Sequence, residues 1–265
     1  MTSNFPLSEW PCWYDPDLDD RPATALGLRV GPTDVEQSVH RHRKGQLALT
    51  VHGAMTCEVP KAKWMVLPNH AVWIPGGMPH SNHATDNARV YFLFIEPGAV
   101  PMPEECCTLA LSPLVRELIQ HLAGQEQDYP PDGMTARLVT VLLEQLSLAP
   151  VDTLKLPISG HPKLRLIAQA LETDPANRNT LAQWARQLAL SERSLARLVQ
   201  RETGLTFGRW RQQLHLIVAL RELASGATVQ QVAGSLGYDS VTAFITMFKK
   251  ALGKPPASYF ATLLH

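Results

Sequence analysis

Short apolar segments separated by turn-forming residues run from about position 26 to position 97. The segments are LGLRV, QLALTV, AMTCEV, KWMVL, AVWIP and RVYFLFIEP, with Gly, Pro, Asn and Asp between them. Six strands at this spacing predict a small β-barrel or sandwich. The preceding residues 1–22 are rich in Pro, Asp and Trp, and we expect an irregular arm there.

The spacing changes to a helical period near residue 111. Ser112 is a helix cap, Pro113 suits the first helical position and Gly124 is a stop, which predicts one helix; residues 134–149 predict a second. The second helix is apolar around much of its circumference, so it packs on the barrel, forms a dimer interface, or does both. Residues 150–162 carry three prolines, a glycine and no period, and they predict a linker over 150–161.

The helical remainder of the chain contains one pattern twice, at residues 180–204 and 228–253. Each copy opens with Thr followed three residues later by Gln, the spacing of a capping box. A short turn and a second Ser cap follow, at Ser191 and Ser240, and each copy ends in Gly. Two helix-turn-helix motifs joined by a long helix over 207–226 are therefore predicted. Such a pair can enter successive major grooves, about 34 Å apart, on one face of DNA.

The net charge of the chain changes sign where the predicted linker ends. Residues 1–160 hold 11 Lys and Arg against 18 Asp and Glu, a net charge of −7, and residues 161–265 hold 13 against 6, a net charge of +7. A polyanion would therefore meet the C-terminal part. The sequence has no run of about 18 apolar residues and no secretion signal, and its four cysteines have no CxxC spacing, so we expect a cytoplasmic protein with reduced thiols.

Residues 162–262 resemble the AraC/XylS type of DNA-binding domain. The resemblance rests on LAQWARQLALSERSLARLVQRETGLTFGRW and on VQQVAGSLGYDSVTAFITMFKKALGKPPASY. It implies sequence-specific control of transcription. By position, the residues offered to base edges are Arg193, Ala196, Arg197, Thr242, Ala243 and Thr246, and those offered to phosphates are Arg201, Arg209, Lys249 and Lys250. The second recognition helix is poor in long polar side chains, so the first is expected to carry more of the specificity.

The β-rich half resembles the cupin barrel. Its first motif reads His40-Arg41-His42, then Gln46 where cupins carry Glu, then Gly53; its second reads PGGMPH and ends at His80. The resemblance implies that His40, His42, Gln46 and His80 are metal ligands, and residues at i and i+2 on one strand would share a face. Three imidazoles and an oxygen suit Ni²⁺, Zn²⁺, Fe²⁺, Co²⁺ or Cu²⁺.

A cupin that has exchanged its metal for an organic ligand, or for none, would keep the same histidines for packing. Aromatic residues are the expected walls of an effector pocket, namely Trp64, Trp73, Phe92 and Phe94, with Tyr91 as a further candidate. Three other histidines, His52, His70 and His83, are additional candidate ligands, and we expect His52 and His83 in surface turns.

These patterns predict an α+β protein of two domains, a cupin barrel with a helix pair and an all-α domain with two helix-turn-helix motifs. The expected divisions are 1–110 for arm and barrel, 111–149 for the helix pair, 150–161 for the linker and 162–265 for the DNA-binding domain. We expect a homodimeric transcription regulator, not an enzyme, that senses a metal or small molecule, with promoter DNA and RNA polymerase as partners. A cupin metalloenzyme with an accessory DNA-binding domain is the alternative, and Gln46 in place of the acid disfavours it. A nucleoid-type binder without a sensor is a third possibility, which a steep salt dependence would reveal.

Overall fold

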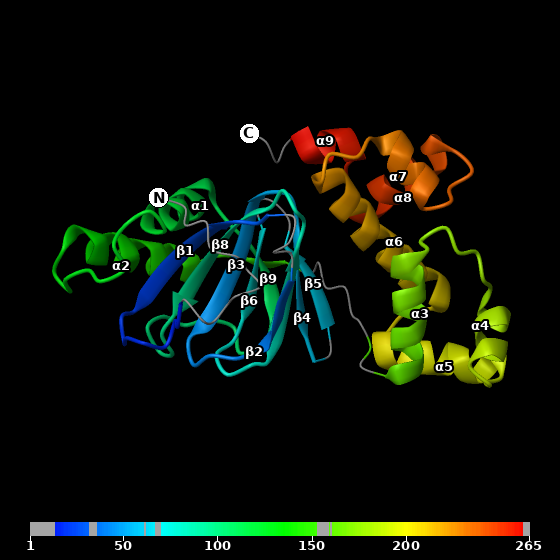
Figure 1. Cartoon of the computed structure of the whole chain (residues 1–265), viewed down its shortest axis with the longest axis horizontal. Helices are drawn as coiled ribbons and strands as arrows, with labels where there is room; N and C mark the ends of the chain where they lie inside the picture. The colour runs from blue at the N-terminus through cyan, green and yellow to red at the C-terminus, as the bar shows by residue number, and fades with distance from the viewer. Residues whose placement is uncertain are drawn as a thin grey trace. The chain divides into compact units, whose positions relative to one another are not determined.

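The computed structural model describes residues 14–31, 36–60, 62–66, 70–152, 159 and 161–261. Most of the predicted arm and linker, the predicted turn at Pro68 and Asn69, and Cys12 lie outside these residues. The chain divides into two compact units, residues 1–155 and 156–265 (Figure 1). No helix within the described part of the chain has the length and apolar content needed to cross a membrane.

Two antiparallel sheets form the first unit. The larger contains, in spatial order, β1 (Ala23–Arg29), β8 (Arg89–Ile95), β3 (Gly45–His52), β6 (His70–Ile74), β9 (Cys107–Ala110) and β10 (Val151–Asp152). The smaller contains β2 (Glu36–His40), β7 (His80–Ala84), β4 (Met55–Val59) and β5 (Ala62–Val66). The six predicted segments became β1, β3, β4, β5, β6 and β8. Strands β2, β7, β9 and β10 are not among those six segments, and β10 lies within the predicted linker.

Alternating residues of the larger sheet serve two different cores. One core lies between the sheets and includes Leu28, Cys57, Trp64, Phe92 and Phe94. The other lies on the opposite face of the larger sheet, which helices α1 (Pro113–Leu122) and α2 (Met134–Ser147) cover (Figure 1). Because the side-chain period of a strand is two, neighbouring residues such as Val72 and Trp73 belong to different cores. The helix pair is therefore part of the first unit's fold.

The second unit is helical. Its elements are α3 (Pro162–Thr173), α4 (Leu181–Gln187), α5 (Glu192–Thr203), α6 (Phe207–Ala224), α7 (Val229–Ser235), α8 (Val241–Leu252) and α9 (Pro256–Ala261). Thr180 and Thr228 form complete capping boxes with Gln183 and Gln231, which fixes the first residues of α4 and α7. Gly204 and Gly253 end α5 and α8 in the left-handed conformation. The prediction of two helix-turn-helix motifs is confirmed.

Candidate metal centre and DNA-binding face

A strand pair brings two of the predicted metal ligands together. His40 ends β2, His80 begins β7, and the two residues are direct partners in the antiparallel register. The prediction that His40 and His42 lie on one strand is wrong, because β2 ends at His40 and His42 lies in the connection to β3. Gln46 is the second residue of β3. The four side chains thus come from both sheets and from the connection between them.

The motif glycines hold that connection in place. Gly77 donates its backbone N–H to the carbonyl oxygen of His42 at 2.7 Å. A Cβ added to Gly76 would lie 2.0 Å from the carbonyl oxygen of Arg43, so only glycine allows this close approach. The second motif therefore positions His42 as well as supplying His80.

Three imidazole rings converge on one point. The candidate ligand nitrogens of His40, His42 and His80 all lie within 4.8 Å of one another. The Oε1 atom of Gln46 lies 3.2 Å from Nε2 of His42 and 3.3 Å from Nε2 of His80. Gln46 is 1% exposed and His80 is 2% exposed, so the cluster is closed to bulk water on most sides.

Backbone carbonyl groups fix which nitrogen of each ring points inward. Nδ1 lies 2.9 Å from the Ser38 oxygen in His40, 2.6 Å from the Lys44 oxygen in His42 and 2.9 Å from the Met78 oxygen in His80. A carbonyl oxygen only accepts, so each Nδ1 must carry the proton when the ring is neutral. Each Nε2 then presents a lone pair, and this second shell is typical of metal-binding histidines.

Burial keeps two of these imidazoles neutral. Burial, with smaller contributions from the neighbouring His40 and His42 rings, outweighs the hydrogen bond to the Met78 backbone and lowers the pKa of His80 to about 3. Burial also lowers the pKa of His40. Neutral imidazole is the form that binds a metal, so these two rings need lose no proton at physiological pH.

The donor set fits a divalent transition metal. Three imidazole nitrogens and an amide oxygen suit Zn²⁺, Ni²⁺, Co²⁺, Fe²⁺ or Cu²⁺. Ligands about 2.1 Å from one ion lie at most about 4.2 Å apart, so nitrogens separated by up to 4.8 Å would have to move closer together to bind it. The competing metal-free arrangement has the Gln46 amide turned over, so that its NH₂ group donates to the rings of His42 and His80. In the present orientation, Nε2 of Gln46 has no hydrogen-bond partner among the described residues.

The predicted pocket walls divide between the two cores. Trp64, Phe92 and Phe94 lie between the sheets, and the Phe94 ring meets the His42 ring edge-on at 5.3 Å. Trp73 lies on the opposite face of the larger sheet, so its assignment to that pocket is wrong. Tyr91 lies with Trp73 for the same reason of strand alternation.

The three additional candidate histidines lie outside the cluster. His52 is exposed at the end of β3, and His70 is half-buried at the start of β6. His83 is exposed but lies within β7, so its expected place in a turn is wrong.

The segment that precedes β1 holds the connection between β2 and β3, which carries His42, through acidic side chains. Asp17 accepts the backbone N–H groups of Arg43 at 2.6 Å and of Lys44 at 3.1 Å. The Lys44 side chain, which is 0% exposed, donates to Asp19 at 3.0 Å. Burial raises the pKa of Asp19, but hydrogen bonds from the Arg21 backbone and from Lys44 outweigh it and lower the pKa overall. The burial of Lys44 could not be predicted from the sequence, because a single lysine in a polar stretch gives no sign of burial.

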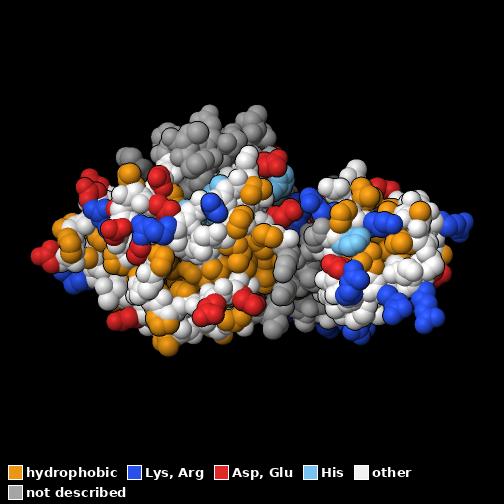
Figure 2. Space-filling view, turned by 90° about the horizontal axis from the view of Figure 1, so that it is seen from below, with side chains coloured by type: hydrophobic (Ala, Val, Ile, Leu, Met, Phe, Trp, Pro, Cys, Tyr) orange, Lys and Arg blue, Asp and Glu red, His pale blue; other side chains and the backbone are white. Residues whose placement is uncertain are grey.

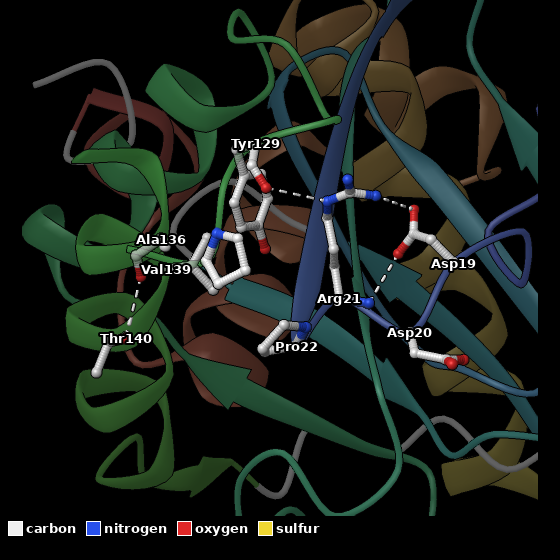
Figure 3. A pocket seen from close by; sticks show the side chains of 9 residues that line it. Asp19, Asp20, Arg21, Pro22, Tyr129, Ala136, Val139 and Thr140 are labelled. Carbon is white, nitrogen blue, oxygen red and sulfur yellow. Dashed lines mark hydrogen bonds and ion pairs between the residues drawn. The ribbon is translucent and has the colours of Figure 1, made fainter. Parts of the chain in front are cut away.

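The same segment contacts the loop between the two covering helices. Arg21 pairs with Asp19 at 3.3 Å, and its Nε donates to the Tyr129 carbonyl oxygen at 3.4 Å (Figure 3). Arg21 also pairs with Asp128. Tyr129 in turn donates its hydroxyl to the Ala23 carbonyl oxygen at 2.6 Å. These residues border a hollow of about 420 Å³ whose far wall is α2. Ion pairs thus connect the His42–Gln46 loop with the helix pair.

The predicted base-reading residues lie along the outer faces of two helices. Arg193 and Arg197 are exposed on α5, Ala196 is half-buried between them, and no described residue pairs with either arginine. On α8, the three predicted residues are exposed, and they are Thr242, Ala243 and Thr246.

Hydrogen bonds already occupy two of the predicted DNA-contacting groups. The Thr246 hydroxyl donates to the Thr242 carbonyl oxygen at 2.8 Å, which leaves its methyl group to face outward. Of the predicted phosphate-binding residues, Arg201 is paired with Glu202, whereas Arg209, Lys249 and Lys250 are exposed.

Basic side chains gather on this unit. On the face shown in Figure 2, Lys and Arg predominate over Asp and Glu in the helical part. A hollow of about 640 Å³ lies beside α5 and is lined by His161, Lys163, Ser194, Arg197 and Arg201, among others. The N-terminal end of α3 therefore adds the cationic Lys163 to the recognition face, and no pattern in the sequence indicated this.

Comparisons with known proteins agree with both halves of this description. Residues 25–156 match the family described as AraC-like ligand binding domain, and residues 184–262 match a helix-turn-helix domain family. The transcriptional regulator NimR of Escherichia coli K12 is 53% identical over 250 residues, which are 94% of this chain and 92% of that protein. Among solved structures, ToxT of Vibrio cholerae O395 is 11% identical with a TM-score of 0.41, over 91% of this chain and 98% of that one. The DNA-binding domain of AdpA, solved with a target DNA, is 29% identical with a TM-score of 0.35, over 38% of this chain and 91% of that one.

A β-rich ligand-binding unit followed by two helix-turn-helix motifs defines a DNA-binding transcription regulator rather than an enzyme. With 53% identity to a regulator of this type over 250 residues, the chain belongs to the AraC family of helix-turn-helix transcriptional regulators.

Proposed function

We propose that this regulator responds to a divalent transition metal bound by His40, His42, His80 and Gln46. One observation carries the proposal: carbonyl groups hold all three Nδ1 atoms, so three Nε2 lone pairs and an amide oxygen meet at one buried point. Electron-pair donors with no donated hydrogen between them are stabilised by a cation. A bound metal would act there as a Lewis acid that accepts the electron pairs of these donor atoms. The protein's residues would transmit the change between the occupied and the empty site.

The ion pairs that begin at Lys44, in the connection between β2 and β3, offer a route for that transmission. Lys44 follows His42 by two residues, Asp19 holds Lys44, and Arg21 connects Asp19 with the loop before α2. Closing of the rings around a metal would shift the backbone at Lys44. The change that the metal causes in the free energy of DNA binding equals the difference in metal-binding free energy between the DNA-bound and the DNA-free regulator.

The metal proposal is tested by substituting one ligand and one matched neighbour. Protein purified without a metal-chelating column is stripped, and Co²⁺ is titrated into the full chain while visible absorption is recorded. We expect one Co²⁺ per chain, at least about tenfold weaker binding for His80→Ala, and unchanged binding for His83→Ala, an exposed histidine of the same strand.

The regulatory part is tested on duplexes that the protein enriches from a random-sequence pool. Their affinity is measured with Co²⁺ and after chelation. Absence of stoichiometric metal together with unchanged DNA affinity would exclude a metal sensor. The interior walls Trp64, Phe92 and Phe94 would then favour an organic effector.

We also propose that α5 reads bases through Arg193, Arg197 and Ala196, and that α8 does so through Thr242, Ala243 and Thr246. Exposure and the absence of partners for both arginines support the first set. In a base-substitution scan of an enriched duplex, Arg197→Ala and Arg193→Ala should each relax the preference at one position, worth about 1–3 kcal/mol. The phosphate-contact control Lys250→Ala should weaken all duplexes alike. Unaltered preferences in both arginine variants would contradict the assignment.

A homodimer held by the helix pair is the assembly we propose. Met134 and Val141 on α2 and Leu148, the C-cap of this helix, are spaced seven residues apart, and their exposed fractions are 62%, 42% and 76%. Leu114 on α1 is 52% exposed. Apolar residues repeating every seven positions on an exposed helix face favour pairing with another helix. A promoter-bound dimer in the cytoplasm would have RNA polymerase as its further partner.

A further inference from the structure

The segment between α3 and α4, residues 174–179, connects the two helix-turn-helix motifs. It leads directly into Thr180, the N-cap of α4, and so belongs to the first motif. The contacts that it makes lie mostly on the second motif and on α6. The two motifs are therefore attached at two places, through α6 and through this segment.

Arg178 makes the main polar contact across this junction. Its Nη2 donates to the Gly237 carbonyl oxygen at 2.6 Å and to Asp239 Oδ1 at 2.7 Å. Gly237 and Asp239 lie in the turn between α7 and α8, and Ser240 then caps the second recognition helix. The Arg178 guanidinium thus contacts the turn from which α8 begins.

Close packing accompanies this contact. Gly237 has a φ of +70°, and a Cβ placed on it would lie 3.1 Å from Ala176 Cα and 3.3 Å from the Ala176 oxygen. A larger residue at Gly237 would be strained and would push the segment away. Arg211 of α6 donates to the Asn179 carbonyl oxygen, and the His215 ring meets the Tyr238 ring edge-on at 6.0 Å.

We infer that this junction fixes the distance and angle between α5 and α8. Through the junction, Arg178 makes the regulator select operators by the spacing of two half-sites, one read by α5 and the other by α8 of the same chain. A single connecting helix can bend, whereas two attachments restrict rotation of one motif against the other. Half-sites displaced by two base pairs are rotated by about 70° around the DNA axis, so a rigid pair would reach only one of them correctly. The inference rests on DNA binding by both motifs and is independent of the metal proposal.

The test uses a variant that breaks the junction without changing net charge. Arg178→Ala with Asp239→Asn removes one positive and one negative charge, so the general attraction to phosphates is matched to the wild type. The full-length wild type and variant each enrich duplexes from a random-sequence pool. Affinities are then measured for the preferred duplex, for one with two base pairs inserted between the half-sites, and for an isolated half-site.

We expect the wild type to enrich one spacing and the variant to enrich the same half-sites at several spacings. The affinity ratio between the preferred and the inserted duplex should fall by about threefold to tenfold, while half-site affinity stays the same. Arg165→Ala, which removes an exposed charge of α3 away from the junction, should weaken all duplexes alike and keep the spacing preference. Wild-type spacing preference in the charge-matched variant would overturn the inference. So would loss of half-site binding in that variant, because Arg178 would then support the fold of one motif and not the relation of the two.

Discussion

Gln46 determines the charge of the candidate metal centre. A carboxylate at this position would neutralise part of a divalent ion's charge, whereas the Gln46 amide leaves the whole charge among neutral donors. The residue is 1% exposed, so solvent does little to compensate. A neutral oxygen ligand favours reversible occupancy, which suits a sensor better than a permanently loaded centre.

Gln46→Glu should therefore raise metal affinity by about tenfold or more, because an anionic oxygen binds a divalent cation more tightly than an amide does. The measurement is competition for Co²⁺ with a chelator of known affinity, on the stripped full-length protein. Gln120→Glu, which adds the same charge on α1, is the control and should change nothing. Equal Co²⁺ affinities for Gln46→Glu and the wild type would mean that this side chain is not a ligand.

Single residues also show where sequence reasoning succeeded and failed. The spacing of the two cupin motifs predicted four side chains that do meet, although His40 and His42 converge through a strand end and a loop and not through strand parity. Trp73 was assigned to the wrong core, because alternation cannot be placed on a face until the strand register is known. Lys44 and Asp19 had no sequence signal, since their pairing joins segments 25 residues apart.

At the scale of elements, predictability followed the strength of local signals. The helices α4, α5, α7 and α8 begin directly after the predicted caps, and α5 and α8 end at the predicted glycines, because these caps are local hydrogen-bonding motifs. By contrast, β7 reads HSNHA and carries little apolar pattern, and β10 has two residues. Their strand conformation comes from pairing with distant partners, which the sequence of each strand does not reveal.

The apolar face of α2 leads to a prediction about assembly. Val141→Lys and Leu148→Lys place a charge within the heptad series and should convert a dimer to a monomer in sedimentation velocity at micromolar concentration. Thr140→Lys, one residue before Val141 and about 100° around the helix, is the matched control and should leave the dimer intact. A monomeric wild type, or a dimer that survives both substitutions, would show that this face has another role.

At the scale of the whole molecule, two units with separate cores divide sensing from DNA binding. The charge division predicted from the sequence follows the same boundary, with −7 before residue 161 and +7 from there on. Each unit therefore has its own stability, and one denaturation curve for the chain combines two transitions. Substitutions confined to one unit can separate them.

His215 makes the DNA-binding unit sensitive to acid. Burial and, to a smaller extent, the nearby Arg211 outweigh a hydrogen bond with the Pro175 backbone and lower the pKa of His215 to about 4. Tyr238 also contacts the ring. The folded unit thus keeps His215 neutral at pH values where the unfolded chain, with an ordinary pKa near 6.5, takes up a proton.

Between about pH 6.5 and pH 4 the unfolded state binds more protons, so the stability of the unit should fall as the pH falls through this window. His215 is partly exposed, and with allowance for solvent screening we expect a loss of about 1–2 kcal/mol relative to neutral pH. His215→Gln removes the titrating group, so the difference in unfolding free energy between wild type and variant should change with pH over this window. Urea denaturation at pH 7 and pH 4.5 measures that difference. A difference independent of pH would mean that His215 titrates alike in the folded and unfolded states, and that acid sensitivity of the chain arises in the other unit.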